Sequence, residues 1–142
     1  MRQKIVAGNW KMHKNAEETE DLLNELIDKL PNDVEAQVIV APTFINLASA
    51  VDHLEFTNIA VAAQNMSQFE SGAYTGEISA DMLKSIGVNI VIIGHSERRA
   101  YFNETDALLA KKVDTALAHD MCAIFCFGEE LEDRKSGNEE AI

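Results

Sequence analysis

The sequence predicts an α/β protein built on a parallel sheet. Five short apolar runs, rich in β-branched residues, alternate along the chain with segments of helical periodicity. Each run is continuously apolar, which is typical of a strand covered on both faces, whereas a half-exposed antiparallel strand would alternate. The expected strands are residues 5–7, 38–40, 59–62, 88–93 and 122–127.

Helical patterns fill the intervals between these runs. Leucines at one-face spacing follow Asn15, an expected N-cap with Glu17 and Glu18 in the first turn, and Pro31 ends that helix. Further helices are expected over 43–51, 79–86 and 105–119. The charged stretch 129–138 is interpreted as an exposed loop, with 138–140 opening a fifth helix.

Strands that alternate with helices form right-handed βαβ crossovers, which leaves two architectures. A doubly wound fold usually carries G-x-G-x-x-G after its first strand, but residues 7–11 read A-G-N-W-K. A (β/α)8 barrel needs about 250 residues, so a barrel here would be incomplete: roughly four βα units, a fifth strand and the start of a fifth helix. No linker divides the chain, so residues 1–142 are expected to be the N-terminal portion of a single domain that stops short of a natural edge.

Composition excludes some classes of partner. The chain has 24 Asp plus Glu against 12 Lys plus Arg, a formal charge of -12, which would repel nucleic acid. A small phosphorylated ligand would then depend on local donors. The N-terminal apolar stretch, residues 5–7, is too short for a signal peptide or a membrane span, so we expect a cytoplasmic protein without a membrane partner.

The two cysteines are predicted to be inert. Cys122 and Cys126 lie four apart on one expected strand, roughly 13 Å from each other at about 3.3 Å per residue, and cannot form a disulfide bond. No histidine stands at ligand spacing from them. We therefore expect buried thiols and no metal site.

Polar residues cluster where the apolar runs end, which is the edge of a parallel sheet where ligands bind. Asn9 and Lys11 follow the first run, Gln64 and Asn65 the third, and H-S-E-R-R at 95–99 the fourth. Each has a simpler reading. Lys11 could be a solvated surface amine, and His95 could be a hydrogen-bonded structural imidazole. Gln64 and Asn65 could only satisfy the backbone of their loop. None of these readings needs a ligand.

The segment 95–99 has structural readings of the same kind. Ser96 could cap a helix. The two arginines that follow it would pair by default with the carboxylates of Glu104 or Asp106.

Four strings taken together resemble the signature segments of triosephosphate isomerases. They are GNWKM at 8–12, GAYTGEIS at 72–79, IGHSERR at 93–99 and CFGE at 126–129, the last with Phe127 in place of the usual aliphatic residue. The resemblance is collinear over all 142 residues. It implies a TIM barrel and an isomerase of glycolysis and gluconeogenesis that interconverts dihydroxyacetone phosphate and D-glyceraldehyde 3-phosphate through an enediolate.

The resemblance assigns roles to single residues. Lys11 would hold the anionic substrate and offset charge on the enediolate, and Asn9 would hydrogen-bond the substrate. His95 would polarise the substrate carbonyl as a neutral imidazole; this family is the standard example of that state, so it is taken from the family. Glu97 would position Lys11, and Ser96 would hold the resting base. Cys126 is expected just behind these residues.

The long connection 64–79 would reach a second subunit in the family, so a homodimer is implied. Thr75 at its tip would contact Asn9 and Glu97 of the other subunit. The residues expected to form this dimer loop are Gln64, Asn65, Tyr74, Thr75 and Gly76.

The family's catalytic glutamate, lid loop and phosphate-binding turns have no counterpart within 1–142, so we expect the chain to be a fragment of the enzyme and inactive alone. It should self-associate or pair with its missing half. No metal or organic cofactor is implied, since proton transfer beside a carbonyl needs only a base and an electrophile. A non-catalytic half-barrel that acts as a binding or assembly module is the alternative, and a different phosphate-binding barrel enzyme is a third hypothesis.

Overall fold

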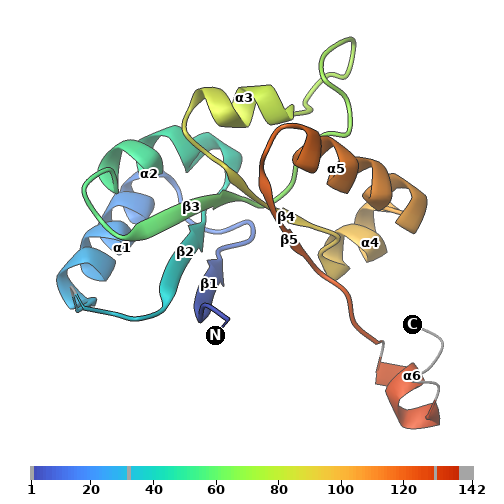
Figure 1. The fold of residues 1–142 in the computed structure, drawn as a ribbon, viewed down its shortest axis with the longest axis horizontal. Helices are drawn as coiled ribbons and strands as arrows, with labels where there is room; N and C mark the ends of the chain where they lie inside the picture. Colours follow the sequence, from blue (N-terminus) through green and yellow to red (C-terminus); the bar gives the residue numbers. More distant parts are fainter. Residues whose placement is uncertain (1, 32, 130, 138–142) are drawn as a thin grey trace.

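Five parallel strands lie side by side in the order of the sequence, and the sheet curls into half a barrel (Figure 1). The computed structural model describes residues 2–31, 33–129 and 131–137. The strands are β1 (Ile5–Asn9), β2 (Gln37–Ala41), β3 (Ile59–Ala63), β4 (Ile90–Ile93) and β5 (Cys122–Phe125). Every strand pairs with its sequence neighbour, whereas a doubly wound sheet would reverse its order. The predicted incomplete (β/α)8 barrel is confirmed.

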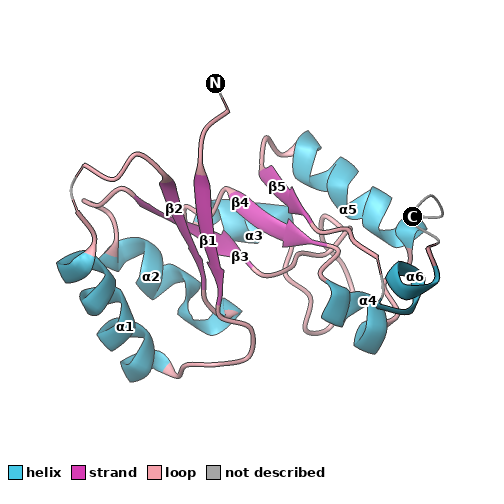
Figure 2. Cartoon of the chain, turned by 90° about the horizontal axis from the view of Figure 1, so that it is seen from below, coloured by secondary structure: helices cyan, strands magenta, loops and turns pink. Residues whose placement is uncertain are grey.

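Helices connect the strands and pack against one face of the sheet (Figure 2). They are α1 (Ala16–Lys29), the 3-10 turn η1 (Phe44–Asn46), α2 (Leu47–His53), α3 (Ala80–Ser85), α4 (Ser96–Phe102) and α5 (Asp106–Ala118). A further helix, α6 (Leu131–Ser136), follows β5 and lies away from the sheet (Figure 1). Within the ranges that the structure describes, none of these helices is long and apolar enough to cross a membrane.

The N-terminus of α1 has the capping expected from its sequence. The Asn15 side chain accepts from the Glu18 amide at 3.0 Å, and the Glu18 carboxylate accepts from the Asn15 amide at 2.9 Å. This reciprocal pair satisfies two amides that the helix itself leaves without partners. Leu30 ends the helix in an extended conformation, as its position before Pro31 requires.

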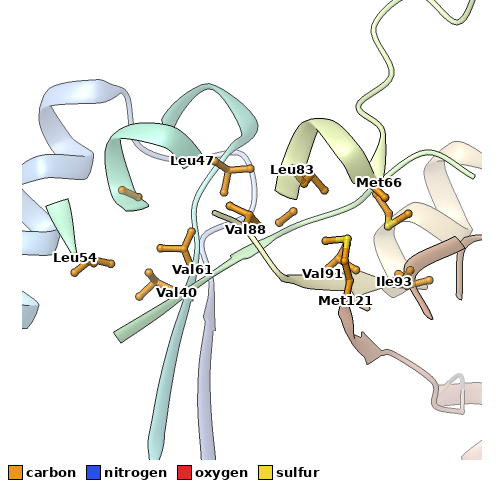
Figure 3. Packing of buried hydrophobic residues seen from close by; sticks show 14 of the residues in the cluster. Val40, Leu47, Leu54, Val61, Met66, Leu83, Val88, Val91, Ile93 and Met121 are labelled. Carbon is orange, nitrogen blue, oxygen red and sulfur yellow. The ribbon is translucent and has the colours of Figure 1, made fainter. Parts of the chain in front are cut away.

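Alternate residues of the central strands face two separate clusters. Val40, Val61 and Val91 join the larger cluster under the helices, which Figure 3 shows in close view. Their neighbours Ile39 and Ile92 join a smaller cluster on the opposite face of the sheet. Both faces of β2, β3 and β4 therefore bury apolar side chains, which explains their continuously apolar sequences.

The two edge strands are more exposed than the central ones. Ile5 and Val6 of β1 are 56% and 61% exposed. Cys122 of β5 is also exposed and Cys126 is only partly buried, so the prediction of two buried thiols is wrong for Cys122 and holds only in part for Cys126. The reason for Cys122 is that β5 has no neighbour on its outer side among the described strands. Both cysteines are free, as predicted.

The segment after β5 contains a helix where the sequence predicted a loop. Residues Leu131–Ser136 form α6. Leu, Glu, Arg and Lys are good helix formers, and Arg134 and Lys135 in the last turn suit the helix dipole. The prediction of an exposed loop over 129–138 is therefore wrong for residues 131–136, because charged residues are also typical of an exposed helix. The predicted helix start at 138–140 lies outside the described residues.

Candidate active site

The ends of the strands bring the predicted polar residues to one edge of the sheet. Parallel pairing aligns Asn9 with Ala41 and Ile93 with Phe125, so the residues that follow β1 and β4 emerge at the same edge. The Gln64 amide after β3 donates to the carbonyl oxygens of Lys11 and Ala41, both at 2.8 Å. Gln64 therefore ties three strand ends together.

Lys11 has an unusual backbone conformation. Its φ of 52° lies in the left-handed region, which non-glycine residues rarely adopt. The Asn9 side-chain oxygen accepts from the Lys11 amide at 2.9 Å and supports this conformation. The turn directs the ammonium group toward α4, where Nζ lies 2.7 Å from Oε1 of Glu97.

His95 directly follows Gly94 after β4 and is the N-cap of α4. Its Nδ1 accepts from the Glu97 amide at 3.2 Å, so His95, and not Ser96, caps this helix; the simpler reading of Ser96 as the cap is wrong. Because Nδ1 accepts this hydrogen bond, Nε2 is the ring nitrogen left to donate to a ligand. The His95 side chain is only 23% exposed.

Glu97 contacts both candidate catalytic groups. Its carboxylate pairs with Lys11, and its amide holds His95. The hydrogen bond from Lys11 lowers the pKa of Glu97, more than burial raises it, and the carboxylate is therefore charged at neutral pH. The Lys11 and Glu97 side chains are 48% and 42% exposed, so an anionic ligand can reach the ammonium group.

A groove beside His95 runs between α4 and the segment that follows β5. His95, Ser96 and Arg99 line one side, and Cys126 and Glu129 line the other. Asn9, Lys11 and Glu97 lie outside this groove.

Arg99 spans the two sides of the groove. It donates to the carbonyl oxygens of Gly94 at 2.8 Å and of Cys126 at 3.2 Å, and to Asp106 at 2.6 Å. Burial raises the pKa of the Cys126 thiol, and the charge of Arg99 offsets only part of this. The raised pKa keeps Cys126 in its protonated thiol form at neutral pH.

A buried ionic cluster connects α4 to α5. Oε1 of Glu104 accepts from Arg98 Nε and from Lys112 Nζ, both at 2.6 Å, and Lys112 also donates to the Asn65 side chain at 2.8 Å. Burial would raise the pKa of Glu104, but the hydrogen bonds from Lys112 and Arg98 outweigh it and lower the pKa. The default pairings of Arg98 with Glu104 and Arg99 with Asp106 are confirmed.

Sequence reasoning missed Lys112, although a signal exists. Leu109, Val113 and Ala116 form the inward stripe of α5, and position 112 falls on the same stripe. A lysine at an inward position predicts a buried cation with a partner. Nothing in the sequence identifies Asn65 as one of its partners.

The loop 64–79 separates its predicted residues into two groups. Gln64 and Asn65 at its base turn inward and bind their own chain. Tyr74, Thr75 and Gly76 at its tip are exposed. Over the part of the chain that the structure describes, no group of three or more His, Cys, Asp or Glu is arranged to hold a metal ion.

Comparisons with known proteins identify related sequences. A family model for triosephosphate isomerase matches residues 4–142. The chain is 77% identical over 136 residues to the triosephosphate isomerase of Flavobacterium psychrophilum, which covers 96% of the chain and 54% of the relative. It is 72% identical over 138 residues to that of Flavobacterium johnsoniae, covering 97% and 55%, and 53% identical over 137 residues to that of Caldanaerobacter subterraneus, covering 96% and 55%. The chain spans about half the length of these relatives.

Proposed function

We propose, from the premise that the chain belongs to the triosephosphate isomerase family, that the full-length protein interconverts dihydroxyacetone phosphate and D-glyceraldehyde 3-phosphate. The reaction moves a proton between adjacent carbons through an enediolate, whose negative charge needs a cation or a hydrogen-bond donor nearby. The observation that carries the proposal is that one residue, Glu97, holds both a lysine ammonium group and the Nδ1 atom of a histidine.

Each of these groups fits one requirement of the reaction. The Lys11 ammonium group would bind the anionic substrate and offset the charge that develops on its oxygen. Nε2 of His95 would donate to the substrate carbonyl. The family resemblance implies that this imidazole is neutral, so it would act as a weak acid. Asn9 supports the Lys11 backbone through its side-chain oxygen, and its amide nitrogen would donate to the substrate.

The base that removes the proton is not assigned within 1–142. Glu97 is occupied by Lys11, and Glu104 is buried in the cluster with Lys112. We propose that the base belongs to the part of the full-length protein that this chain does not cover. Ser96, exposed at the rim of the groove, would hold that base at rest, with Cys126 behind it.

The exposed tip of the loop 64–79 supports a homodimer. Tyr74, Thr75 and Gly76 would dock onto the partner subunit, where Thr75 would contact the partner's Asn9 and the partner's Glu97. The substrate is then a small triose phosphate, with no cofactor, and we place the enzyme in the cytoplasm as the sequence predicts.

The test is an isomerase assay of the full-length protein, coupled to reduction of the product. We expect turnover, and we expect His95→Gln to lower kcat by about 10²- to 10⁴-fold with a smaller change in KM, because the imidazole acts mainly on the transition state. His53→Gln is the matched control, since His53 lies on α2 and bonds Asn24. Absence of turnover in the wild type, or a change in KM alone, would contradict the proposal.

Experiments on residues 1–142 alone distinguish a fragment of the isomerase from a non-catalytic half-barrel module. We expect no turnover, because base catalysis and a positioned substrate are both missing. We also expect association through the edge strands β1 and β5 or pairing with an added second half, which sedimentation velocity would detect. A monomer that melts cooperatively would favour the half-barrel module.

A further inference from the structure

The loop 64–79 is attached to α5 at three points. The three side chains are Lys112 and Thr115 on α5 and His119 at its C-cap. They are spaced three and four residues apart and therefore share one face of the helix. Each contacts a residue of the ascending half of the loop. The contacts are Lys112 Nζ to Asn65 Oδ1 at 2.8 Å, Thr115 Oγ1 to the Gln68 carbonyl oxygen at 3.1 Å, and His119 Nε2 to Glu70 Oε2 at 2.7 Å.

The rest of the loop is braced by its own contacts. The Ser67 amide donates to the Ile78 carbonyl oxygen at 2.8 Å and closes the base of the loop. The rings of Phe69 and Tyr74 stack at 3.8 Å with an angle of 2° between their planes. The loop thus behaves as a stiff unit, whose direction depends on what holds its ascending half.

We propose that this face of α5 sets the direction of the loop, and that Thr115 and His119 are positioning residues for its docking onto a second copy of the chain. The inference rests on the proposed homodimer. A loop that is already oriented loses less conformational freedom on docking, so its anchors raise the affinity of the dimer without touching the partner.

Thr115 and His119 can be altered without disturbing α5. The Thr115 hydroxyl lies 2.9 Å from the Lys111 carbonyl oxygen as well as 3.1 Å from that of Gln68, so its hydrogen is shared between the helix and the loop. The backbone carbonyl of His119 is held by Lys84 at 2.6 Å, which side-chain replacement leaves in place. Lys112 is unsuitable because it also neutralises the buried Glu104.

The experiment compares dimer dissociation constants of full-length variants by sedimentation over a dilution series. We expect Thr115→Val with His119→Leu to raise the constant by about tenfold or more. Thr115→Ser with His119→Gln keeps a hydroxyl and a side-chain donor and should restore an affinity near that of the wild type. Lys111→Ala with Asp114→Ala, on the exposed face of α5, is the matched control and should change nothing.

Two further measurements keep the outcomes distinct. Hydrogen exchange at the Ser67 amide should quicken in the Val/Leu variant, and Glu70→Ala, which alters only an exposed carboxylate, should weaken the dimer in the same direction even if the double variant folds poorly. A dimeric, active wild type whose affinity is unchanged in all of these variants would overturn the anchor alone. A monomeric wild type would overturn the homodimer as well.

Discussion

Two lysine–glutamate pairs lie at α4, one through Glu97 in its first turn and one through Glu104 just after it, and their N···O distances are nearly the same. Lys11 and Glu97 are 2.7 Å apart and about half exposed, whereas Lys112 and Glu104 are 2.6 Å apart with side chains only 3% exposed. Water can replace either partner of the first pair, but no solvent reaches the second. The same contact is therefore exchangeable at one site and structural at the other.

The largest difference between the pairs should appear in stability. Lys112→Met leaves Glu104 charged and buried with Arg98 alone, and we expect the unfolding free energy of the full-length protein to fall by about 3–5 kcal/mol. Urea denaturation measures this. Lys11→Met is the matched control and should leave the urea midpoint within the scatter of repeated runs. Equal losses in the two variants would erase the distinction.

Activity should show the reverse order. Lys11→Met removes the cation that we propose to bind the anionic substrate, and we expect kcat/KM of the full-length protein to fall by about 10²- to 10³-fold, as for other groups that stabilise charge in a transition state. Steady-state kinetics would show this, together with weaker inhibition by a doubly charged phosphate analogue. Unchanged inhibition would remove Lys11 from the site.

The two pairs should also differ, by a smaller amount, in how their contribution to stability depends on pH. The pKa of Glu104 is lowered in the folded state, so its contribution to stability is complete above the usual pKa of about 4.3 and is lost as the pH falls through the folded value. The gap in urea midpoint between the wild type and Glu104→Gln should therefore narrow below about pH 4.3. Glu97→Gln serves as the control. The pKa of Glu97 is also lowered, but its exposure to solvent should keep any gap too small to follow. A gap for Glu104 that persists at low pH would contradict this.

Much of the fold could be predicted because its signals are local. The apolar runs marked all five strands, and Asn15 and Pro31 marked the ends of α1 within a few residues. The placement of Cys122 was wrong because an apolar run does not reveal whether its strand lies at an edge of the sheet.

The site could be predicted only in part, because some of its contacts join residues that are far apart in the sequence. Lys11 and His95 stand in strings specific enough to carry a family resemblance, although the roles drawn from it stay predictions. The contact of Lys112 with Asn65 joins residues 47 positions apart, and no sequence pattern spans that distance. His95 as a helix cap was missed because serine, the next residue, is the more usual cap and an imidazole nitrogen is a rare one.

The backbone conformation of Lys11 sets thermal stability against activity, because the residues that suit it best lack the ammonium group. Lys11 and Lys14 both have positive φ, 52° and 74°, a conformation that glycine or asparagine adopts with less strain. A library sorted only by heat resistance should enrich such replacements at both positions. At 14 they would be harmless, but at 11 they would remove the ammonium group that contacts Glu97. A substitution at residue 11 could therefore raise thermal stability and at the same time lower isomerase activity.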